Sequence, residues 1–432
     1  MQESTTAPKN ALVLGAGIIG LCSAYYLQQA GFDVTVIDQE NEVGHQTSYA
    51  NGAQLSYSYV APLAAPGVLS QVPKWLLNPD APMRLKPSLN PADICWGIRF
   101  AKACTAEQSL QTTKELLSLS FLSRDLFHQL FEEIKDVDFD RPGKLVVHRD
   151  RAHFESAVKQ LEIQRSLGCE QEALNTEQCV EKEPALAPLR SQIVGGIWTP
   201  NEEVVDSFKL SLPIRKNLET KGVTFLLGNR IRSLATVPAS TSNSSYSQEV
   251  EVVLANGQRL TADAIVVALG SFANELLEPI KVNVPVGPLK GYSLTLDIED
   301  SEQAPYVSIT DYERKVVYAR IGNRLRIAGM ADRVGLDKTL DPKRINTLIT
   351  EAKKLFPAAG NYAQATQWAG LRPATPKGKP VIDKTQYGNL WLNLGHGALG
   401  LTLASGSGKL LAEMINGQTP SILATPFRQS EA

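Results

Sequence analysis

The spacing of apolar residues near the N-terminus predicts a strand, a helix and a second strand in close succession. Residues 11–14 form a short apolar run typical of a buried strand. A helical pattern follows and ends near Gly31, and residues 34–37 form a second strand-like run. This succession predicts the parallel sheet of an α/β protein.

Three later segments extend this first domain. Residues 206–222 predict an amphipathic helix that Asp206 caps and Gly222 ends. Residues 262–271 are rich in β-branched side chains and end in a glycine turn, which predicts a third buried strand. The polar stretch 237–249 lies between two strand-like runs, 223–227 and 249–253, and predicts the solvated loop of a hairpin.

A different pattern predicts a second domain. Residues 143–150, 286–298 and 315–330 alternate apolar and polar side chains, with a hairpin turn at Gly322 and Asn323, whereas residues 115–134 are strongly helical. The alternation favours a mixed or antiparallel sheet over a parallel one. We therefore expect an α/β fold (α+β overall) in which a Rossmann-like domain is interleaved with a second domain. The expected boundaries are 9–56, 107–138, 201–284 and 366–425 for the first domain, and 139–200 and 285–365 for the second.

Residues 57–106 fit neither pattern. Prolines recur through this segment, with aromatic and aliphatic residues between them, so we expect an extended surface excursion packed by its own apolar residues. A flap over an active site, or a contact with a membrane or an electron acceptor, is the alternative function of this segment. Its large apolar residues are Trp75, Leu76, Leu77, Trp96, Ile98 and Phe100.

Bulk composition excludes several classes of protein. The 43 basic and 45 acidic residues nearly cancel, and no dense basic run is present, so nucleic-acid binding is not expected. The five cysteines form no C-x-x-C motif, which favours free thiols in a reducing compartment and no metal site. No secretory signal and no uninterrupted apolar stretch long enough to span a bilayer is visible, so a cytoplasmic location is expected.

Gly15, Gly17 and Gly20 stand in G-x-G-x-x-G spacing between the first strand and the helix. In such a loop the first glycine permits the tight turn, the second lets a pyrophosphate approach the backbone, and the third lets the helix lie close to the sheet. The helix N-terminus offers free N–H groups to phosphates. Asp38 ends the second strand, where a carboxylate accepts hydrogen bonds from a ribose and repels a 2′-phosphate. These features predict a dinucleotide site and leave NAD and FAD both open.

Several stretches together resemble one family, the FAD-dependent amino-acid oxidoreductases that include D-amino acid oxidase and glycine oxidase. Within it they are most similar to the bacterial D-amino acid dehydrogenases of the small-subunit type. The stretches are LVLGAGIIG, TSYANGAQLS, YVAPLAAPGV, PLKGYSL, WAGLRPATPKGKPVI and NLWLNLGHGALGLTLASGSG. They span nearly the whole chain in order, so the combination is far more specific than any one of them.

The resemblance implies that the cofactor is FAD and that the first domain is FAD-binding, the second substrate-binding. The residues around His45 do not match the motif through which some relatives link FAD covalently, so non-covalent FAD is expected. The second glycine-rich turn, GHGALG, precedes a helix whose N-terminus would stabilise negative charge on a reduced flavin. Each turn could also be a plain connection without a ligand. The implied cofactor-binding residues are Gly15, Gly17, Ile18, Ile19, Gly20, Asp38, Gln39, Thr47, Ser48, Asn51, Gly52, Gln54, Ile231, Ala268, Gly270, Gly395, Gly397, Ala398, Leu399, Gly400 and Leu401.

Arg372, in the motif AGLRP, is the most consequential single residue. The resemblance implies that its guanidinium grips the α-carboxylate of a substrate, for which a planar fork of donors is well shaped. A structural ion pair is the alternative. Tyr292, Tyr57 and Tyr318 are candidates for a hydroxyl that adds to this grip, or they are core tyrosines. His396 is expected near the flavin edge, or it only shapes the turn.

The implied reaction is oxidative deamination of small neutral D-amino acids, above all D-alanine. Hydride transfer from Cα to FAD yields an imine that water hydrolyses to a 2-oxo acid and ammonia, with no protein base required. The implied electron acceptor is a quinone or another respiratory carrier, with peripheral contact at the inner membrane left open. Two alternatives remain: oxidation of a secondary amine (D-proline, hydroxyproline, sarcosine or glycine), and a non-catalytic flavin-holding subunit of a larger complex. An NAD-dependent dehydrogenase is disfavoured because the second glycine turn and AGLRP would have no role in it.

Overall fold

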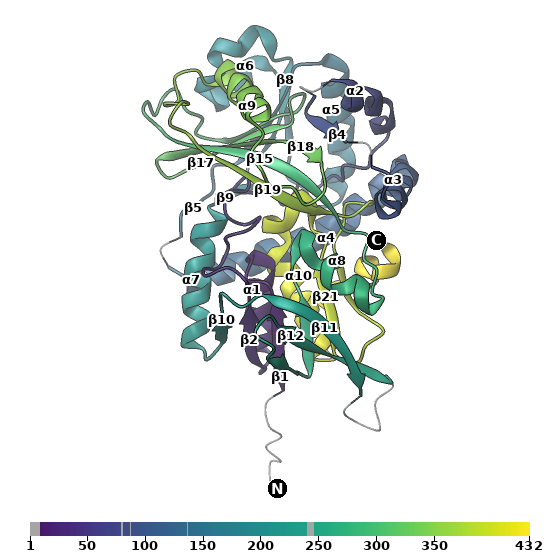
Figure 1. The fold of residues 1–432 in the computed structure, drawn as a ribbon. Coiled ribbons are helices and arrows are strands. Elements are labelled where there is room, and N and C mark those ends of the chain that lie inside the picture. Colours follow the sequence, from purple (N-terminus) through teal and green to yellow (C-terminus); the bar gives the residue numbers. More distant parts are fainter. Residues whose placement is uncertain (1–8, 79–80, 87, 136, 240–245) are drawn as a thin grey trace.

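The computed structural model describes residues 9–78, 81–86, 88–135, 137–239 and 246–432. Its lower half in Figure 1 is built on a six-stranded sheet with the order β10-β2-β1-β14-β21-β20. The first five strands are parallel, and β20 runs antiparallel to β21. Their bounds are β1 Asn10–Leu14, β2 Asp33–Ile37, β10 Thr224–Leu226, β14 Ala264–Val267, β20 Val381–Lys384 and β21 Leu390–Leu394.

Strand β1 shows how both faces of this sheet are buried. Ala11 and Val13 pack into a core with the helices on one face, whereas Leu12 and Leu14 pack on the opposite face, as the two-residue period of a strand requires. The helical layer contains α1 Ile18–Gln29, α4 Ala106–Glu133, α7 Ser207–Thr220 and α10 Gly400–Ile415. The other face is covered by a small antiparallel sheet of β11 Ile231–Pro238, β12 Gln248–Leu254 and β13 Arg259–Leu260.

Small residues on α10 let this helix approach its neighbours closely. A Cβ atom at Gly408 would lie 2.7 Å from the backbone of Cys22 on α1, and one at Gly406 would lie 2.7 Å from the carbonyl oxygen of Leu119 on α4. Both distances are far below van der Waals contact. The run ASGSG in the predicted last helix therefore serves close helix packing.

The upper half of the molecule is a large sheet with the order β19-β15-β18-β17-β16-β6-β8-β7, in which β4 also pairs with β18. Most neighbours are antiparallel, but β16 with β6 and β18 with β4 are parallel, so the sheet is mixed as predicted. The bounds are β4 Met83–Leu85, β6 Lys144–His148, β7 Glu172–Leu174, β8 Gly195–Thr199, β15 Gly287–Asp297, β16 Ser308–Asp311, β17 Val316–Ile321, β18 Arg324–Arg333 and β19 Thr366–Ala374.

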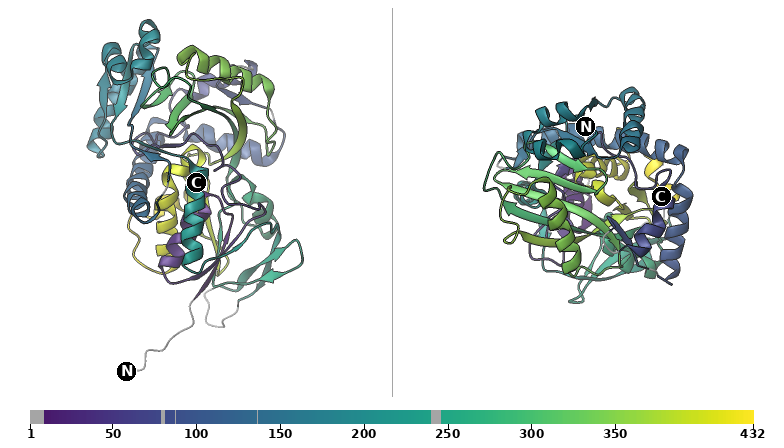
Figure 2. Two further views of the ribbon diagram at one scale, coloured as in Figure 1. Left: turned by 90° about the vertical axis from the view of Figure 1, so that its left-hand side faces the viewer. Right: turned by 90° about the horizontal axis from the view of Figure 1, so that it is seen from above.

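Helix α9 Pro342–Leu355 packs on the outer face of this large sheet. Three short strands, β3 Gln54–Leu55, β5 Phe139–Asp140 and β9 Glu203–Val205, form a fourth sheet where the chain crosses between the halves. Figure 2 shows the two halves stacked along the long direction of the molecule. The remaining helices are α2 Val72–Leu77, α3 Pro91–Ala103, α5 Arg151–Ser166, α6 Thr176–Lys182 and α8 Ala273–Leu277, with 3-10 turns at Val68–Gln71, Pro184–Gln192, Gly270–Phe272, Glu278–Ile280, Gly397–Leu399, Thr425–Phe427 and Gln429–Glu431.

Two details differ from the sequence-based expectations. The hairpin partner of β12 is β11, whereas residues 224–226 belong to the parallel sheet, so the predicted hairpin of 223–227 with 249–253 was wrong. Residues 231–238 form β11, a strand that the pattern did not indicate. Residues 240–245 of the predicted loop lie outside the residues that the structure describes. Residues 57–106 are also less extended than expected, because they contain α2, β4 and α3.

The predicted boundary at residue 366 assigns β19 to the first domain, but β19 pairs with β15 in the large sheet along its whole length. The helix capped by Asp206 and the turn at Gly322 agree with prediction.

Candidate active site

A cavity of about 680 Å³ lies between the carboxyl ends of the parallel strands and the inner face of the large sheet. Gly15 after β1, Asp38 after β2 and Ala268 after β14 all line it, as do residues following β21. Open α/β sheets bind ligands at this edge, since the loops that leave the strands converge there. The volume is within the range of cofactor and ligand sites.

The three glycines of the first loop occupy different positions around this cavity. Gly15 has a φ of +108°, and a Cβ there would meet the Ala268 carbonyl oxygen at 2.7 Å. A Cβ at Gly20 would lie only 1.8 Å from the carbonyl oxygen of Gly15, so this glycine serves helix packing and does not line the cavity. Gly17 is different, because a Cβ there would meet only Ser48 Oγ, at 3.5 Å. The backbone of Gly17 is thus open to a ligand.

Asp38 lies at the cavity wall and is held in place by backbone donors. Its Oδ2 accepts from the Ala16 N–H at 2.6 Å and its Oδ1 from the Glu40 N–H at 2.9 Å. Burial raises the pKa of this carboxyl group, and the backbone hydrogen bonds oppose that shift. Gln39 and Ile231 line the wall, as expected, with Arg230 and Arg232, which the sequence analysis did not single out.

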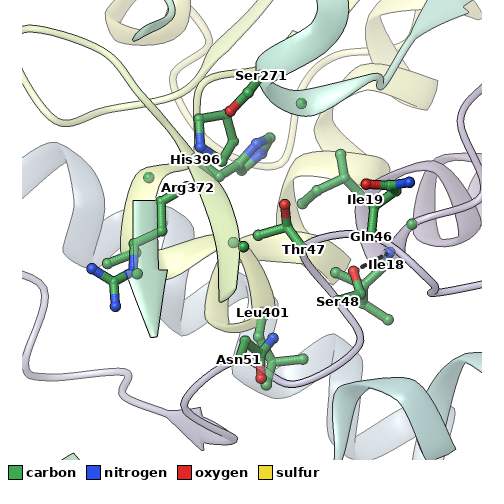
Figure 3. Close-up of a pocket in the computed structure, with 18 of the residues that line it drawn as sticks. Ile18, Ile19, Gln46, Thr47, Ser48, Asn51, Ser271, Arg372, His396 and Leu401 are labelled. Atoms are coloured by element: carbon green, nitrogen blue, oxygen red, sulfur yellow. Dashed lines mark hydrogen bonds between the residues drawn. The ribbon is translucent and has the colours of Figure 1, made fainter. Parts of the chain in front are cut away.

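The loop that follows Asp38 forms a long part of the wall (Figure 3). Ser48 Oγ accepts from the Ile18 N–H at 3.1 Å, and Thr47 Oγ1 donates to the Leu371 carbonyl at 2.8 Å. Asn51 Oδ1 accepts from the N–H of Ala53, whose φ is +56°. The predicted members Ile18, Ile19, Thr47, Ser48, Asn51, Gly52 and Gln54 all line the cavity, together with Gln46, Ala50, Ala53 and Ser56, which were not predicted.

The second glycine turn brings the N-terminus of α10 to the cavity. His396, Gly397, Ala398, Leu399, Gly400 and Leu401 line it, as does Gly270 after β14. Gly395 does not; it has a φ of +81° and makes the turn. His396 is 3% exposed, and its Nε2 lies 3.1 Å from Ser407 Oγ. Burial lowers the pKa of His396 to about 3, so the imidazole is neutral at neutral pH.

Arg372 reaches the cavity from β19, across the glycine at position 291. A Cβ at Gly291 would lie 2.5 Å from the guanidinium, which explains why a residue without a side chain stands there. One guanidinium nitrogen donates to the Met330 carbonyl at 2.8 Å. Burial lowers the pKa of Arg372 and the carboxylate of Asp332 raises it, but the guanidinium remains a cation at any working pH.

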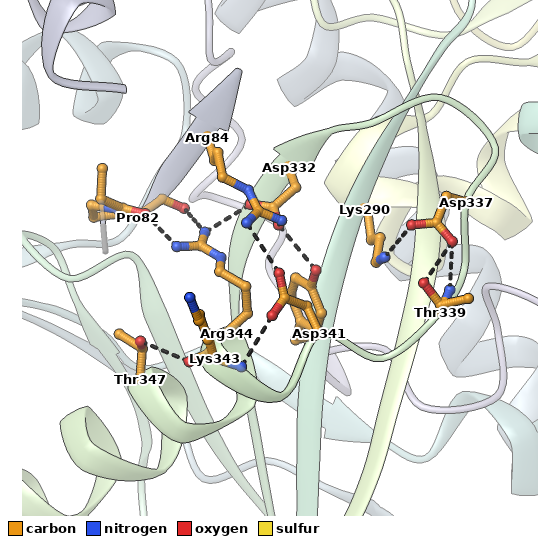
Figure 4. Close-up of polar contacts among 12 residues, drawn as sticks. Pro82, Arg84, Lys290, Asp332, Asp337, Thr339, Asp341, Lys343, Arg344 and Thr347 are labelled. Atoms are coloured by element: carbon orange, nitrogen blue, oxygen red, sulfur yellow. Dashed lines mark hydrogen bonds and ion pairs between the residues drawn. The ribbon is translucent and has the colours of Figure 1, made fainter. Parts of the chain in front are cut away.

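Asp332, the carboxylate that raises the pKa of Arg372, is fully buried and lies among other charged side chains (Figure 4). It pairs with Arg84 at 2.6 Å and with Arg344 at 2.8 Å, and it accepts from the Tyr292 hydroxyl at 3.0 Å. Tyr292 is among the residues that line the cavity, but its side chain packs in the core on the outer face of the large sheet and its hydroxyl donates to Asp332. This cluster fixes the wall that carries Arg372.

Tyr57 and Tyr318 do not reach the cavity. Tyr318 is fully buried on the outer face of the large sheet, against Phe356, because it neighbours Val317 and a strand sends adjacent side chains to opposite faces. The Tyr57 hydroxyl donates to Glu203 at 3.0 Å inside the protein core. Neither hydroxyl is placed to contact a ligand in the cavity, so the structure does not support the site role considered for these two residues.

Two lysines on the cavity wall escaped the sequence analysis. Lys144 is 2% exposed, and its Nζ donates to Ser56 Oγ at 2.8 Å. Burial lowers the pKa of Lys144 and raises that of nearby Glu202, and each charge partly offsets the shift of the other. Lys315 lines the wall from the turn before β17. A lysine within an alternating strand gives no signal by itself, since such residues normally face solvent.

Two absences hold for the part of the chain that the structure describes. No group of three or more His, Cys, Asp and Glu side chains is placed to hold a metal ion. No helix there is long and apolar enough to cross a membrane. The five cysteines are free thiols, of which Cys22, Cys169 and Cys179 are buried.

Comparison with known proteins places these features in context. A family model described as FAD dependent oxidoreductase matches residues 10–414. The chain is 48% identical to D-amino acid dehydrogenase 2 of Ralstonia nicotianae, covering 96% of this chain and 98% of that protein. It is 42% identical to D-amino acid dehydrogenase of Dechloromonas aromatica, covering 95% and 97%.

Solved structures share the fold at low sequence identity. Glycine oxidase from Geobacillus kaustophilus is 18% identical with a TM-score of 0.75, covering 99% of this chain and 100% of that one. L-proline dehydrogenase from P. horikoshii is 16% identical with a TM-score of 0.73, covering 98% and 97%. These two likenesses concern the arrangement of the chain in space.

Proposed function

Because the chain belongs to the FAD-dependent oxidoreductase family, we propose that it catalyses the oxidative deamination of D-amino acids with FAD as its cofactor. The relatives that bear the name D-amino acid dehydrogenase match it over nearly their whole length. The observation that carries the proposal is the Arg372 guanidinium, which stands at the cavity on the side opposite the glycine loop, in a wall fixed by buried Asp332.

The residues along the carboxyl edge of the parallel sheet fit FAD. The open backbone at Gly17 and the N-terminus of α1 suit a pyrophosphate, and Asp38 suits a ribose diol. The N-terminus of α10 adds a second positive dipole end at the same cavity. When bound, FAD supplies the acceptor for the two electrons that leave the substrate. Non-covalent attachment fits these contacts.

Arg372 would bind the substrate α-carboxylate and so orient its Cα and amine within the cavity. A neutral amine provides its own electron pair for imine formation. The residues of the cavity therefore only have to position the substrate, and none of them has to act as a base. Neutral His396 adds no charge that would compete for the carboxylate. Water then hydrolyses the imine to a 2-oxo acid and ammonia.

Finer features of the proposal are D-alanine as the main substrate and a quinone or another respiratory carrier as electron acceptor. The protein would work in the cytoplasm, with peripheral contact at the inner membrane through residues 57–106. Leu76, Leu77 and Ile98 of that segment are 49%, 83% and 53% exposed, which supports such a contact, whereas Trp96 is 9% exposed and packs inward. Flotation with lipid vesicles tests it: wild type should float, and Leu76→Ser with Leu77→Ser should not.

The domain assignment is part of the same proposal. Residues 9–56, 107–138, 201–284 and 366–425 would bind FAD, 139–200 and 285–365 would bind substrate, and 57–106 would form the separate proline-rich excursion. The pairing of β19 with β15 supports moving residues 366–374 from the FAD-binding part to the substrate-binding part.

Product analysis tests the proposed reaction. Purified FAD-loaded protein with an artificial dye acceptor should convert D-alanine to pyruvate and ammonia in equal amounts, and L-alanine should give neither. Turnover of D-proline or sarcosine in preference to D-alanine would support the secondary-amine alternative. No turnover of any of them would favour the flavin-holding subunit.

A further inference from the structure

The inner face of the large sheet carries a row of residues that crosses several strands and reaches β19 at Trp368, four residues before Arg372. Directly opposite positions in neighbouring antiparallel strands point to the same face. The pairs Thr310 with Val317 and Val317 with Ala328 place three cavity-lining residues in one such row. Gly329 lines the cavity beside them. The sheet therefore offers a floor of small side chains between its polar ends.

Lys315 stands at one side of this floor, close to the arginine in register. It lines the cavity from the turn just before β17, next to Val316, which pairs with Gly329. Arg372 donates to the carbonyl of Met330, the residue after Gly329. Arg372 contacts β18, Lys315 precedes the next strand, β17, and Thr310 lies on the strand after that, β16. Because neighbouring strands lie about 5 Å apart, Lys315 is roughly one strand spacing and Thr310 roughly two strand spacings from β18.

The backbone at this point is held in an uncommon conformation. Lys315 has a φ of +55° and Met330 a φ of +61°, both in the left-handed region that residues with side chains seldom adopt. Such strain gathers at ligand sites when the surrounding structure enforces it. Here Lys315 lines the cavity, and a Cβ atom at Gly329, the residue before Met330, would lie 3.2 Å from the Lys315 carbonyl oxygen.

The polar groups at this end have capacity for a ligand. Thr310 is 4% exposed, and its hydroxyl has no hydrogen-bond partner among the described residues. The Lys315 ammonium lies 3.5 Å above the Tyr312 ring. The acids nearest to it have other partners, since Asp311 pairs with Arg149 at 2.9 Å and Glu313 lies 3.2 Å from His153.

From this arrangement we propose that Lys315 and Thr310 form a subsite for a carboxylate on the substrate side chain, so that the protein oxidises acidic D-amino acids such as D-glutamate and D-aspartate. The inference rests on the proposed function, with Arg372 holding the α-carboxylate. D-Alanine reacts but leaves the subsite unused. The Cα hydrogen of D-glutamate passes to FAD with its two electrons, one N–H proton of the amine is released, and water hydrolyses the resulting imine to a 2-oxo diacid and ammonia.

Anaerobic rapid mixing tests the subsite by the rate of flavin bleaching at low substrate concentration. D-Glutamate should bleach the flavin at least about 10-fold faster than its neutral isostere, D-glutamine. Lys315→Met keeps the length of the side chain and should lower the rate with D-glutamate roughly 10- to 100-fold while D-alanine stays within about 3-fold. Thr310→Val should give a smaller loss in the same direction. Lys353→Met changes an exposed lysine of α9 and should alter neither rate.

Calorimetry with glutarate and butyrate gives a second readout that needs no turnover. Wild type should bind glutarate more tightly than butyrate, and Lys315→Met should abolish the difference. Equal rates with D-glutamate and D-glutamine, or equal losses with D-glutamate and D-alanine in Lys315→Met, would overturn the subsite. If no D-amino acid bleaches the flavin, the proposed function is wrong. The comparison of glutarate with butyrate still tests whether the subsite binds a carboxylate. Thermal unfolding of each variant confirms that it is folded.

Discussion

Asp332 is the residue on which the substrate wall depends most, and its replacement by asparagine isolates the effect of its charge. The carboxylate is 0% exposed and contacts Arg344, which is 1% exposed, Arg84, and the Tyr292 hydroxyl. In Asp332→Asn the amide fills nearly the same volume but removes the negative charge that pairs with the buried Arg344 cation. Removing one partner of a buried ion pair costs about 3–5 kcal/mol, and we expect a loss in that range in the free energy of unfolding.

Asp341→Asn is the matched control for this substitution. Asp341 pairs with the same Arg84 at 3.0 Å, but its side chain is 26% exposed. It also caps α9 through the Lys343 N–H, a role that asparagine fills equally well. Because solvent screens this pair, its loss should cost no more than about 1 kcal/mol.

Equilibrium urea unfolding of both FAD-loaded variants measures the difference. A cost below about 1 kcal/mol for Asp332→Asn, or equal costs for the two variants, would refute the reasoning that buried charge pairing fixes this wall.

Three further predictions concern the cavity. Arg372→Met should lower kcat/KM for D-alanine by at least about 100-fold, since charge-assisted hydrogen bonds to the carboxylate are lost, and Arg372→Lys should restore part of it; an unchanged steady-state kcat/KM would exclude Arg372 from substrate binding. Gly17→Ala should leave the melting temperature of the FAD-free protein unchanged, because its Cβ meets only Ser48 Oγ at 3.5 Å, yet weaken FAD binding at least about 10-fold by fluorescence titration. His396 has a pKa of about 3 when folded and about 6.5 when unfolded, so the unfolded state binds more protons between these values and stability falls as pH is lowered through them. The wild-type stability relative to His396→Asn should therefore drop by about 1.4 kcal/mol per pH unit below pH ~6, as measured by urea unfolding; a difference that does not change with pH would contradict a buried neutral imidazole.

The strands and helices of the first domain could be predicted because their signals are local. A capping residue such as Asp206, a glycine at a turn and a run of β-branched residues act within a few positions of the chain. Strand β11 was missed because residues 231–238 alternate weakly and their role depends on pairing with β12. Pairing is a property of two segments, which local patterns do not specify.

The residues of the site also differ in whether the sequence alone predicts them. Motif positions such as Gly17 and Arg372 carry a resemblance that the sequence displays directly. Tyr318 and Lys315 show the limit, because both belong to an alternating stretch and the pattern does not tell which of its two faces meets the cavity. Lys144 reaches Ser56 from 88 residues away along the chain, a contact that only the folded sheet creates.

The anaerobic absorption spectrum of the purified FAD-loaded protein, recorded after D-alanine and separately after L-alanine, tests the central claim most directly. We expect the flavin band near 450 nm, a typical position for oxidised flavins, to bleach with the D-enantiomer alone. A band that persists with D-alanine while the flavin is bound, or that bleaches equally with both enantiomers, would contradict the oxidation of D-amino acids at the Arg372 wall.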